Sequence, residues 1–313
     1  MLSYLKNMEA FMDLQIVEWF QGLSNGFFDA FFGLITEFGG DLVFLVVGTL
    51  LFWLYDKRFG YRFMTLFLFT LGLNDIFKNF IQRPRPFVAD NAESIGEETY
   101  GYAMPSAHSS NAGIMALVLN ERFGKLKKFI TPTLFTMMVL VGLSRVYLGQ
   151  HYLSDVMMGF LLAAVVFYFY RRYDSLIEEN ATIVISSALG LLLLFMIIFG
   201  VFYDTLGIDS TESFRNLYIA FGSILGLSLG HKLELKYVKY SEKAPWFIQI
   251  AKYVIGLIVA LIIQEGFKRV LPYPDTQTML TVILDSIRYF LLTLWLSLGA
   301  LATFKALFKQ FEA

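Results

Sequence analysis

The chain contains no cysteine, three histidines and little charge. The absence of cysteine from its 313 residues excludes disulfides and thiolate metal sites. Charged residues make up 16% of the sequence, whereas soluble domains usually carry about 25%. The net charge of -1 argues against a nucleic-acid partner, which would need a basic surface. We expect no cleavable signal peptide, because the first apolar segment lacks a basic leader and a small-residue cleavage site.

Apolar residues fill most of the chain, and 57% of the sequence is hydrophobic. A helix that crosses a bilayer needs about 20 mostly apolar residues. We predict nine such helices, at residues 39–56, 61–80, 107–121, 129–146, 152–170, 182–203, 216–233, 247–267 and 279–304. The predicted fold class is therefore an all-α, polytopic membrane bundle. In the preceding stretch, phenylalanine pairs lie four residues apart, which is typical of a helix that lies in the membrane interface or packs against the bundle.

Lysine and arginine gather on alternate loops, and this bias predicts the orientation in the membrane. The basic loops and the C-terminal tail hold Lys57, Arg58, Arg62, Arg122, Lys125, Lys127, Lys128, Arg171, Arg172, Lys232, Lys236, Lys239, Lys243, Lys305 and Lys309. We expect this side to be cytoplasmic, with the N-terminus outside and the C-terminus inside. A bacterial plasma membrane is the expected location, and an endoplasmic reticulum membrane would fit the same topology. Four basic residues fall on the opposite side and need another explanation: Lys78, Arg83, Arg85 and Arg145.

The stretch KNFIQRPRP places Lys78 seven residues before Arg85. Seven residues are close to two helical turns, so the two cations could face the same way. Pro84 and Pro86 argue that the helix ends first and leaves Arg85 on a turn. Taken alone, the pattern is also typical of basic side chains that snorkel to the interface.

The stretch MPSAHSS predicts a helix start after Pro105, with Ser106 as the N-cap. Free N–H groups at a helix start suit an anion, and here Ser106 adds a hydroxyl and His108 an imidazole. The alternative interpretation is ordinary capping beside an incidental histidine.

The stretch SRVYLGQHYLSD places His151 and Asp155 four residues apart, on one face of a helix. A carboxylate bonded to Nδ1–H leaves Nε2 as a basic lone pair, which makes a histidine nucleophilic. Arg145 comes six residues before His151. The alternative is a buried histidine–aspartate pair that only satisfies itself.

Together the three motifs are far more specific, because the loop charges place all of them on one membrane face. Cations and N–H donors can hold the oxygens of a phosphoryl group while one histidine attacks and the other handles the leaving proton. The planar fork of arginine suits this role. The residues therefore favour phosphoryl transfer.

The three motifs resemble, in order and in internal spacing, the signatures of the type 2 phosphatidic acid phosphatase superfamily, which also includes vanadium haloperoxidases. The resemblance covers about residues 40 to 175. It implies a phosphatase that uses no metal or cofactor and forms a phosphohistidine intermediate. It implies that His151 attacks phosphorus, that Asp155 orients it, and that His108 protonates the leaving oxygen and then activates water.

The resemblance also assigns the phosphate-binding groups. These are Lys78, Arg85, Arg145, the Ser106 hydroxyl and the backbone N–H of Ala107. The family usually has glycine at position 107, so the backbone here must adopt a φ that alanine tolerates. The six-helix core of the family would end near residue 203. We therefore expect an N-terminal interfacial segment (1–38), a phosphatase core (39–203) and an extension of about three further transmembrane helices (204–313).

The C-terminal third carries two features outside the motifs. Gly222, Gly226 and Gly230 recur every four residues, a spacing that allows close helix contact either within the bundle or across a homodimer. Ionisable residues also fall in or near its apolar segments. Among them we expect Glu265 to pair with Arg288.

The leading hypothesis is hydrolysis of a lipid phosphate among the membrane lipids, such as phosphatidic acid, phosphatidylglycerol phosphate or a polyprenyl diphosphate. The nine-helix layout is also similar to the glucose-6-phosphatase branch, so a soluble phosphate ester is the alternative. A transporter that uses the motifs only to bind is a third reading, and an inactive relative a fourth. Against transport, a pure binder does not need an aspartate-oriented histidine beside a second histidine, and no inverted repeat is visible.

Overall fold

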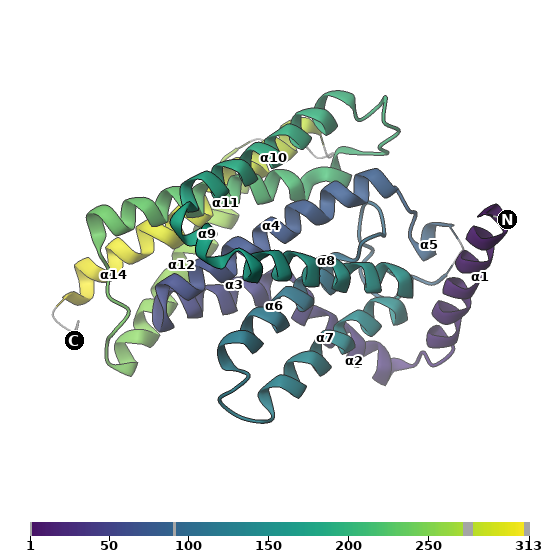
Figure 1. The fold of residues 1–313 in the computed structure, drawn as a ribbon, viewed down its shortest axis with the longest axis horizontal. Coiled ribbons are helices and arrows are strands. Elements are labelled where there is room, and N and C mark those ends of the chain that lie inside the picture. The colour runs from purple at the N-terminus through teal and green to yellow at the C-terminus, as the bar shows by residue number, and fades with distance from the viewer. Residues whose placement is uncertain (1, 90–91, 272–277, 310–313) are drawn as a thin grey trace. The chain divides into compact units, whose positions relative to one another are not determined.

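The computed structural model describes residues 2–89, 92–271 and 278–309, and its regular elements are helices (Figure 1). The chain divides into two compact units. Unit 1 comprises Met1–Phe44 and Asn74–Asp174, and unit 2 comprises Leu45–Leu73 and Ser175–Ala313. The all-α fold class predicted from the sequence is confirmed.

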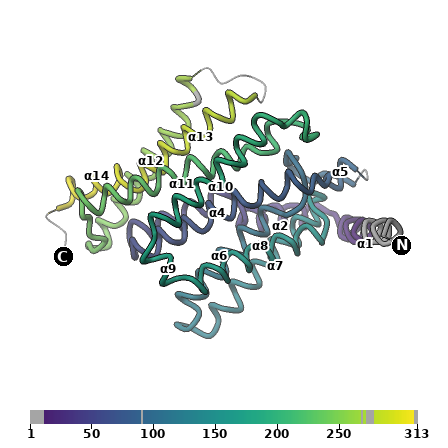
Figure 2. The backbone as a smooth tube through the Cα atoms, turned by 45° about the horizontal axis from the view of Figure 1, so that its top comes forward, coloured from purple at the N-terminus to yellow at the C-terminus, as the bar shows by residue number. Residues whose placement is uncertain are grey.

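Unit 1 contains two N-terminal helices, a short 3-10 turn and a layer of three longer helices. They are α1 (Leu2–Gln21), α2 (Gly26–Thr36), η1 (Glu37–Gly39), α5 (Pro86–Ala89), α6 (Ala107–Phe123), α7 (Ile130–Tyr147) and α8 (Leu153–Arg172). Helices α3 (Asp41–Leu50), α4 (Lys57–Ile81) and α9 (Asp174–Glu179) contribute residues to both units. Helices α6, α7 and α8 lie side by side in both views (Figures 1 and 2).

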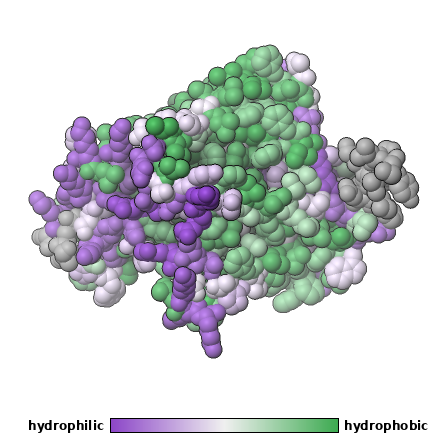
Figure 3. Space-filling model, viewed as in Figure 1, coloured by the Kyte–Doolittle hydropathy of each residue, from purple (hydrophilic) through white to green (hydrophobic). Residues whose placement is uncertain are grey.

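Unit 2 is built around α11 and α13. Apart from the shared helices, its elements are η2 (Leu51–Tyr55), α10 (Ala181–Phe202), η3 (Thr211–Phe214), α11 (Arg215–Leu233), η4 (Glu234–Val238), α12 (Trp246–Val270), α13 (Met279–Leu294), η5 (Trp295–Gly299) and α14 (Ala300–Phe308). Helix α10 exposes apolar side chains along its length, as a lipid-facing helix does, and the part of the molecular face where it lies is largely hydrophobic (Figure 3).

All nine helices predicted from the sequence form, three of them continued by a π-helical turn. Among the described residues, length and apolarity alone identify five of them as membrane spans, or six if the bent segment from Gly26 to Tyr55 counts as one. Helices α4, α6 and α11 fall outside this set. Helix α6 is only 17 residues long and α4 is charged near both ends, while α11 is rich in glycine and serine. The chain is a multi-span membrane protein.

Helix α2 packs against α7 through one of its faces. The ring of Phe32 lies 4.4 Å from that of Tyr147, whose hydroxyl donates a hydrogen bond of 2.5 Å to Asp29. Phe27, on another face of α2, is 72% exposed. Packing against a bundle helix is therefore confirmed for this segment, while its position in the membrane interface stays a prediction.

The glycines of α11 pack against α13 and η5 within unit 2. A Cβ at Gly222 would lie 2.1 Å from the carbonyl oxygen of Ser286, and one at Gly226 would lie 2.3 Å from that of Phe290. At Gly230 it would meet Ser297 Oγ at 2.0 Å. Contact within the chain is therefore confirmed. These glycines leave no face open to a second copy, so the homodimer suggested for this row is not formed through it.

Replacing Gly222 with alanine is expected to destabilise the protein by about 1–3 kcal/mol, because the added methyl group meets backbone that cannot move aside cheaply. The measurement is thermal unfolding in detergent. Gly190→Ala on α10 is the matched control, since nothing lies within 4 Å of a Cβ there. Equal melting temperatures for the two variants would contradict the close packing.

The pairing expected between Glu265 and Arg288 is wrong. Glu265 is exposed, whereas the buried Arg288 pairs with Asp285 on its own helix at 2.8 Å. Arg215 on α11 approaches the other oxygen of Asp285 at 2.5 Å. The aspartate thus pairs with two arginines inside unit 2.

Candidate active site

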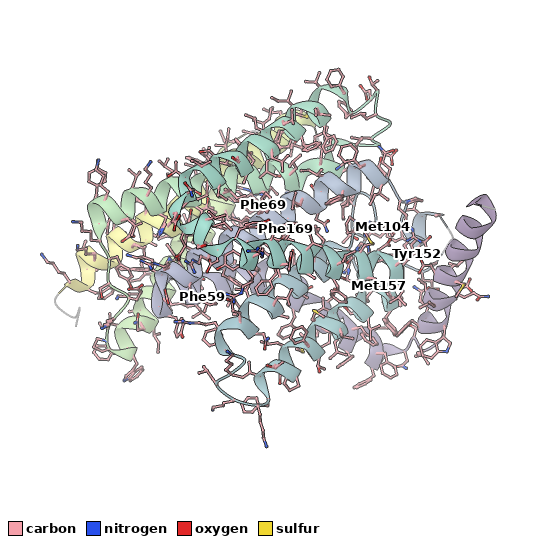
Figure 4. All side chains as sticks on the ribbon, in the orientation of Figure 1. Phe59, Phe69, Met104, Tyr152, Met157 and Phe169 are labelled. Atoms are coloured by element: carbon pink, nitrogen blue, oxygen red, sulfur yellow. The ribbon has the colours of Figure 1, made fainter. Side chains whose placement is uncertain are left out.

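The three sequence motifs converge in unit 1, where four helix ends meet. Lys78 lies in the last turn of α4, and Arg85 follows on the turn before α5. Ser106 caps α6, Arg145 ends α7, and Asp155 lies in the first turn of α8. Tyr152, the residue before α8, marks this end of the helix, while Phe169 lies toward the other end (Figure 4).

A tight turn between α7 and α8 fixes His151 relative to Arg145. The backbone N–H groups of Gln150 and His151 donate to the Arg145 carbonyl at 3.0 and 3.2 Å. Gly149 has a φ of +70°, and a Cβ there would lie 2.0 Å from the carbonyl oxygen of Glu93. Glycine is therefore required at this turn, which places the histidine and the arginine on one short loop.

His151 is buried, and its two ring nitrogens face different partners. Nε2 lies 3.1 Å from Nη1 of Arg85. Because a guanidinium only donates, Nε2 is the acceptor, and the neutral ring carries its proton on Nδ1. Nδ1 lies 3.6 Å from Asp155 Oδ2, and it has no hydrogen-bond partner among the described residues. The contact is longer than the direct hydrogen bond predicted from the i, i+4 spacing.

The Asp155 carboxylate is held by other donors, which explains the longer distance. Oδ2 accepts a hydrogen bond of 2.8 Å from the backbone N–H of Tyr152. Oδ1 is paired with Arg83 at 2.9 Å. Asp155 is completely buried, so these contacts fix the rotation of the carboxylate beside the imidazole.

Arg85 is bound to backbone carbonyl groups around the site. It donates to the carbonyl oxygens of Gly101 at 2.8 Å, Tyr100 at 2.9 Å and Gln150 at 3.0 Å. Burial lowers the pKa of Arg85 to about 10, while the charge of Asp155 opposes this shift. The guanidinium therefore remains a cation at neutral pH, held in one orientation beside His151 Nε2.

Arg145 has one donor that no side chain satisfies. Its Nη1 donates to Thr36 Oγ1 at 3.0 Å, and Nη2 contacts Thr99 Oγ1 at 3.5 Å. Its Nε is buried and has no partner among the residues that the structure describes. A buried N–H without an acceptor is costly. An anion bound at this place would supply the acceptor.

The start of α6 adds further polar groups. Ser106 Oγ accepts from the Ser109 N–H at 3.4 Å and from the Ser109 hydroxyl at 2.9 Å, which leaves its own O–H to donate. The Ser106 N–H donates to the Asp155 carbonyl at 3.0 Å and so joins this helix start to α8. Ala107 is the first helical residue and does not have a positive φ, so alanine in place of the usual glycine causes no backbone strain.

Lys78 and His108 complete the group. Lys78 is buried, and His108, at the second position of α6, lies in the field of Arg145, Lys78 and Arg85. A glycine in η1 allows this approach, since a Cβ on Gly39 would lie 2.8 Å from the His108 carbonyl oxygen. All eight residues predicted for the site thus lie at neighbouring helix ends of one unit.

Several supporting residues escape the sequence motifs. Thr36 and Thr99 contact Arg145. Gln150 lies inside the third motif but is not among the residues that the motif indicates; its side-chain carbonyl anchors the turn by accepting from the Thr99 hydroxyl at 2.6 Å. Arg83 lies inside the first motif, and the sequence signal for it is that the loop bias predicts few basic residues on its side of the membrane. No sequence signal indicated Asp13, which pairs with Arg83 at 2.9 Å.

A metal cluster is not apparent in the described part of the chain, where no three His, Cys, Asp or Glu side chains lie close enough together to hold an ion. Apart from the Asp155 carboxylate and one accepting imidazole nitrogen, the groups gathered at the site are donors and cations. Such a donor set fits an oxyanion.

Comparison with known proteins identifies two matching regions. The pattern of the PAP2 superfamily matches residues 59–179, and that of the transmembrane extension of PAP2 superfamily phosphatases matches residues 218–310. Phosphatidylglycerophosphatase B of Bacillus subtilis is 35% identical over 34% of this chain and 54% of its own length. Sphingosine-1-phosphate phosphatase 1 of Rattus norvegicus is 25% identical over 75% of this chain and 58% of its own length.

The chain thus spans a little over half the length of these two curated relatives. The crystal structure of a transmembrane PAP2-type phosphatidylglycerolphosphate phosphatase from Bacillus subtilis aligns with a TM-score of 0.47. It is 27% identical, over 55% of this chain and 88% of the other. The two regions that match the superfamily patterns include all three motifs and most of the C-terminal third. The chain therefore belongs to the PAP2 superfamily, with a PAP2 domain followed by the transmembrane extension of that superfamily.

Proposed function

We propose that this protein is a membrane phosphatase that hydrolyses a lipid phosphate through a phosphohistidine intermediate on His151. The observation that carries the proposal is the arrangement around Nε2 of this histidine. Its lone pair faces the Arg85 fork at 3.1 Å, while Arg145 presents a buried N–H without an acceptor. These groups would hold phosphoryl oxygens and present the phosphorus atom to the nitrogen.

In the first step, His151 Nε2 attacks phosphorus, the N–P bond forms and the P–O bond to the lipid breaks. His108 gives its proton to the leaving oxygen. Lys78, Arg85 and Arg145 carry the negative charge that spreads over the phosphoryl oxygens, and the Ser106 hydroxyl and the Ala107 N–H donate to the same oxygens. Asp155 stabilises the positive charge that develops on the imidazole ring.

In the second step, water attacks phosphorus on the phosphohistidine. His108, now unprotonated, accepts a proton from this water, the N–P bond breaks and inorganic phosphate leaves. Both histidines return to their starting states, so the cycle balances without a metal ion or a cofactor.

A lipid substrate fits the membrane setting. Four helix ends carry the site, a level at which a lipid headgroup lies, and the relatives named above are phosphatases of phosphatidylglycerol phosphate and sphingosine 1-phosphate by name. We place the site on the non-cytoplasmic side of a bacterial plasma membrane, with the N-terminus outside and the C-terminus inside. Domain boundaries at residues 38 and 203 stay a prediction.

The test is phosphate release by the purified protein in EDTA, from phosphatidic acid, phosphatidylglycerol phosphate, a polyprenyl diphosphate and glucose 6-phosphate. Preferential release from the dispersed lipids supports the proposal. Preference for glucose 6-phosphate would favour the soluble-ester alternative. Binding without release from any substrate would leave a transporter or an inactive relative.

The pH dependence of kcat/KM provides a further prediction. Burial, reinforced by the charges of Arg85, Arg145 and Lys78, lowers the pKa of His151 well below its usual value of about 6.5. Neutral His151 is the nucleophile, and a lowered pKa means that protonation removes it only in more acidic solution. The acid limb of kcat/KM, on which the free enzyme loses neutral His151, should therefore lie below the usual histidine value of about 6.5.

The measurement is a pH–rate profile, corrected for the titration of the substrate phosphate itself. Arg85→Gln removes the largest charge acting on His151, so in this variant the acid limb should move to higher pH. A wild-type acid limb centred at or above pH 6.5, unmoved in Arg85→Gln, would contradict the prediction.

A further inference from the structure

Arg83 lies on the side of Asp155 that faces away from His151. Its Nη1 is 2.9 Å from Asp155 Oδ1 and donates to Ser154 Oγ at 2.5 Å. Its guanidinium carbon lies 4.0 Å from the centre of the Tyr152 ring. The backbone carbonyl of Arg83 accepts from the Ala103 N–H at 2.8 Å. Both the main chain and the side chain of Arg83 are thus fixed in place.

Asp13 on α1 holds the other side of the same fork. Its Oδ2 is paired with Nη2 of Arg83 at 2.9 Å and also accepts the hydroxyl of Ser154. Its Oδ1 accepts the backbone N–H of Ser154 at 3.2 Å, at the start of α8. The side chains of Asp13, Arg83 and Asp155 therefore form a continuous chain of alternating charge that ends at His151.

We propose that Arg83, held by Asp13, is a positioning residue that keeps Asp155 oriented and ionised beside His151. The proposal rests on the function proposed above. It adds two residues to the site: Arg83, whose side chain contacts Asp155, and Asp13, whose side chain holds Arg83.

The two oxygens of the Asp155 carboxylate have different partners. Oδ2 must face Nδ1 of His151, and among the described residues the backbone N–H of Tyr152 holds it there. A completely buried carboxylate with one such bond is poorly compensated, because a charge taken out of water needs a partner. Arg83 supplies that partner at Oδ1, so it fixes the rotation about the carboxylate and also favours its charged form. Without Arg83, Asp155 would turn or take up a proton, and the Nδ1–H tautomer of His151 would lose its support.

The experiment compares Arg83→Ala, Arg83→Lys and Asp13→Asn with the wild type. Residues that position a catalytic group typically change activity by about 10- to 100-fold. We expect Arg83→Ala to lower kcat by roughly this factor, with KM and the inhibition constant of inorganic phosphate within about threefold of the wild type. Arg83→Lys should recover part of the loss, and Asp13→Asn should show a smaller one. Arg171→Ala, which breaks an arginine–carboxylate pair with Glu121 at the exposed end of α8, is the matched control and should be unchanged.

A second readout does not depend on turnover. The chain has three histidines, so nitrogen NMR of the protein labelled with 15N-histidine gives few signals. The wild type should show His151 protonated on Nδ1, and Arg83→Ala should shift the ring toward the other tautomer or a mixture. An unchanged tautomer, or a kcat within twofold of the wild type, would overturn the proposal. A wild type without phosphatase activity would overturn the proposed function alone, and the tautomer would still decide the role of Arg83.

Discussion

Replacing His151 with asparagine is expected to abolish phosphate release. The amide keeps hydrogen-bonding atoms in the pocket but cannot form the N–P bond, and loss of a catalytic nucleophile costs roughly 10⁴-fold or more in kcat. The protein should remain folded, because the ring of His151 is bound mainly through one contact to Arg85. The measurement is single-substrate phosphate release, with the best lipid from the substrate panel, at saturating concentration.

The chain offers its own control for this experiment. His231 on α11 stacks on Tyr61 with ring centres 4.1 Å apart, and both residues lie in unit 2. His231→Asn should therefore keep full activity. If His151→Asn released phosphate at more than about a hundredth of the wild-type rate, His151 would not be the nucleophile and the phosphohistidine mechanism would be wrong.

Replacing Arg145 with alanine should have the second largest effect. Its Nε is a preorganised donor without a partner, and removal of one such donor from a transition-state site costs about 10²- to 10³-fold in rate. We expect a loss of this size in kcat/KM. Arg145→Lys should recover little, because a lysine cannot bond Thr36 and hold a phosphoryl oxygen with a second nitrogen.

The melting temperature of Arg145→Ala should not fall together with its activity. A buried cation with an unsatisfied donor is a poor contributor to folding, so Arg145→Ala should leave the melting temperature unchanged or raise it. Thr36→Val separates orientation from charge, because it removes the partner of Nη1 and leaves the guanidinium in place. A large fall in the melting temperature of Arg145→Ala, with activity lost in proportion, would mean that the residue is structural.

The location of the site could be predicted from the sequence because charged residues are costly, and therefore rare, near membrane-spanning segments. In an apolar chain, Lys78, Arg85 and Arg145 stand out against the loop bias, and the order of the helices alone brings their ends to one face. The helices were equally predictable, since about 20 apolar residues in a row have few other outcomes. The spacing of His151 and Asp155 predicted their proximity, and the structure places Nδ1 of the histidine 3.6 Å from Oδ2 of the aspartate.

Contacts that depend on helix rotation could not be predicted in this way. Glu265 and Arg288 fall at similar depths in neighbouring apolar segments, yet Arg288 turns toward Asp285, three residues before it on the same helix. Thr36 and Asp13 are ordinary residue types, separated by more than a hundred residues from Arg145 and Ser154. No periodicity indicates such partners. Only the packing of α1, α2 and η1 on the helix layer brings them to the site.

The reach of α1 and η1 into the site has a consequence for the smallest active piece of this protein. Residues 59–179, which the PAP2 pattern matches, contain every motif residue. That stretch omits Asp13, which fixes Arg83 and Ser154, and Thr36, which orients Arg145. It also omits Gly39, on which His108 packs. A chain shortened to residues 59–179 would keep the motif residues and lose the contacts that orient them. An autonomous catalytic fragment therefore has to begin before residue 13.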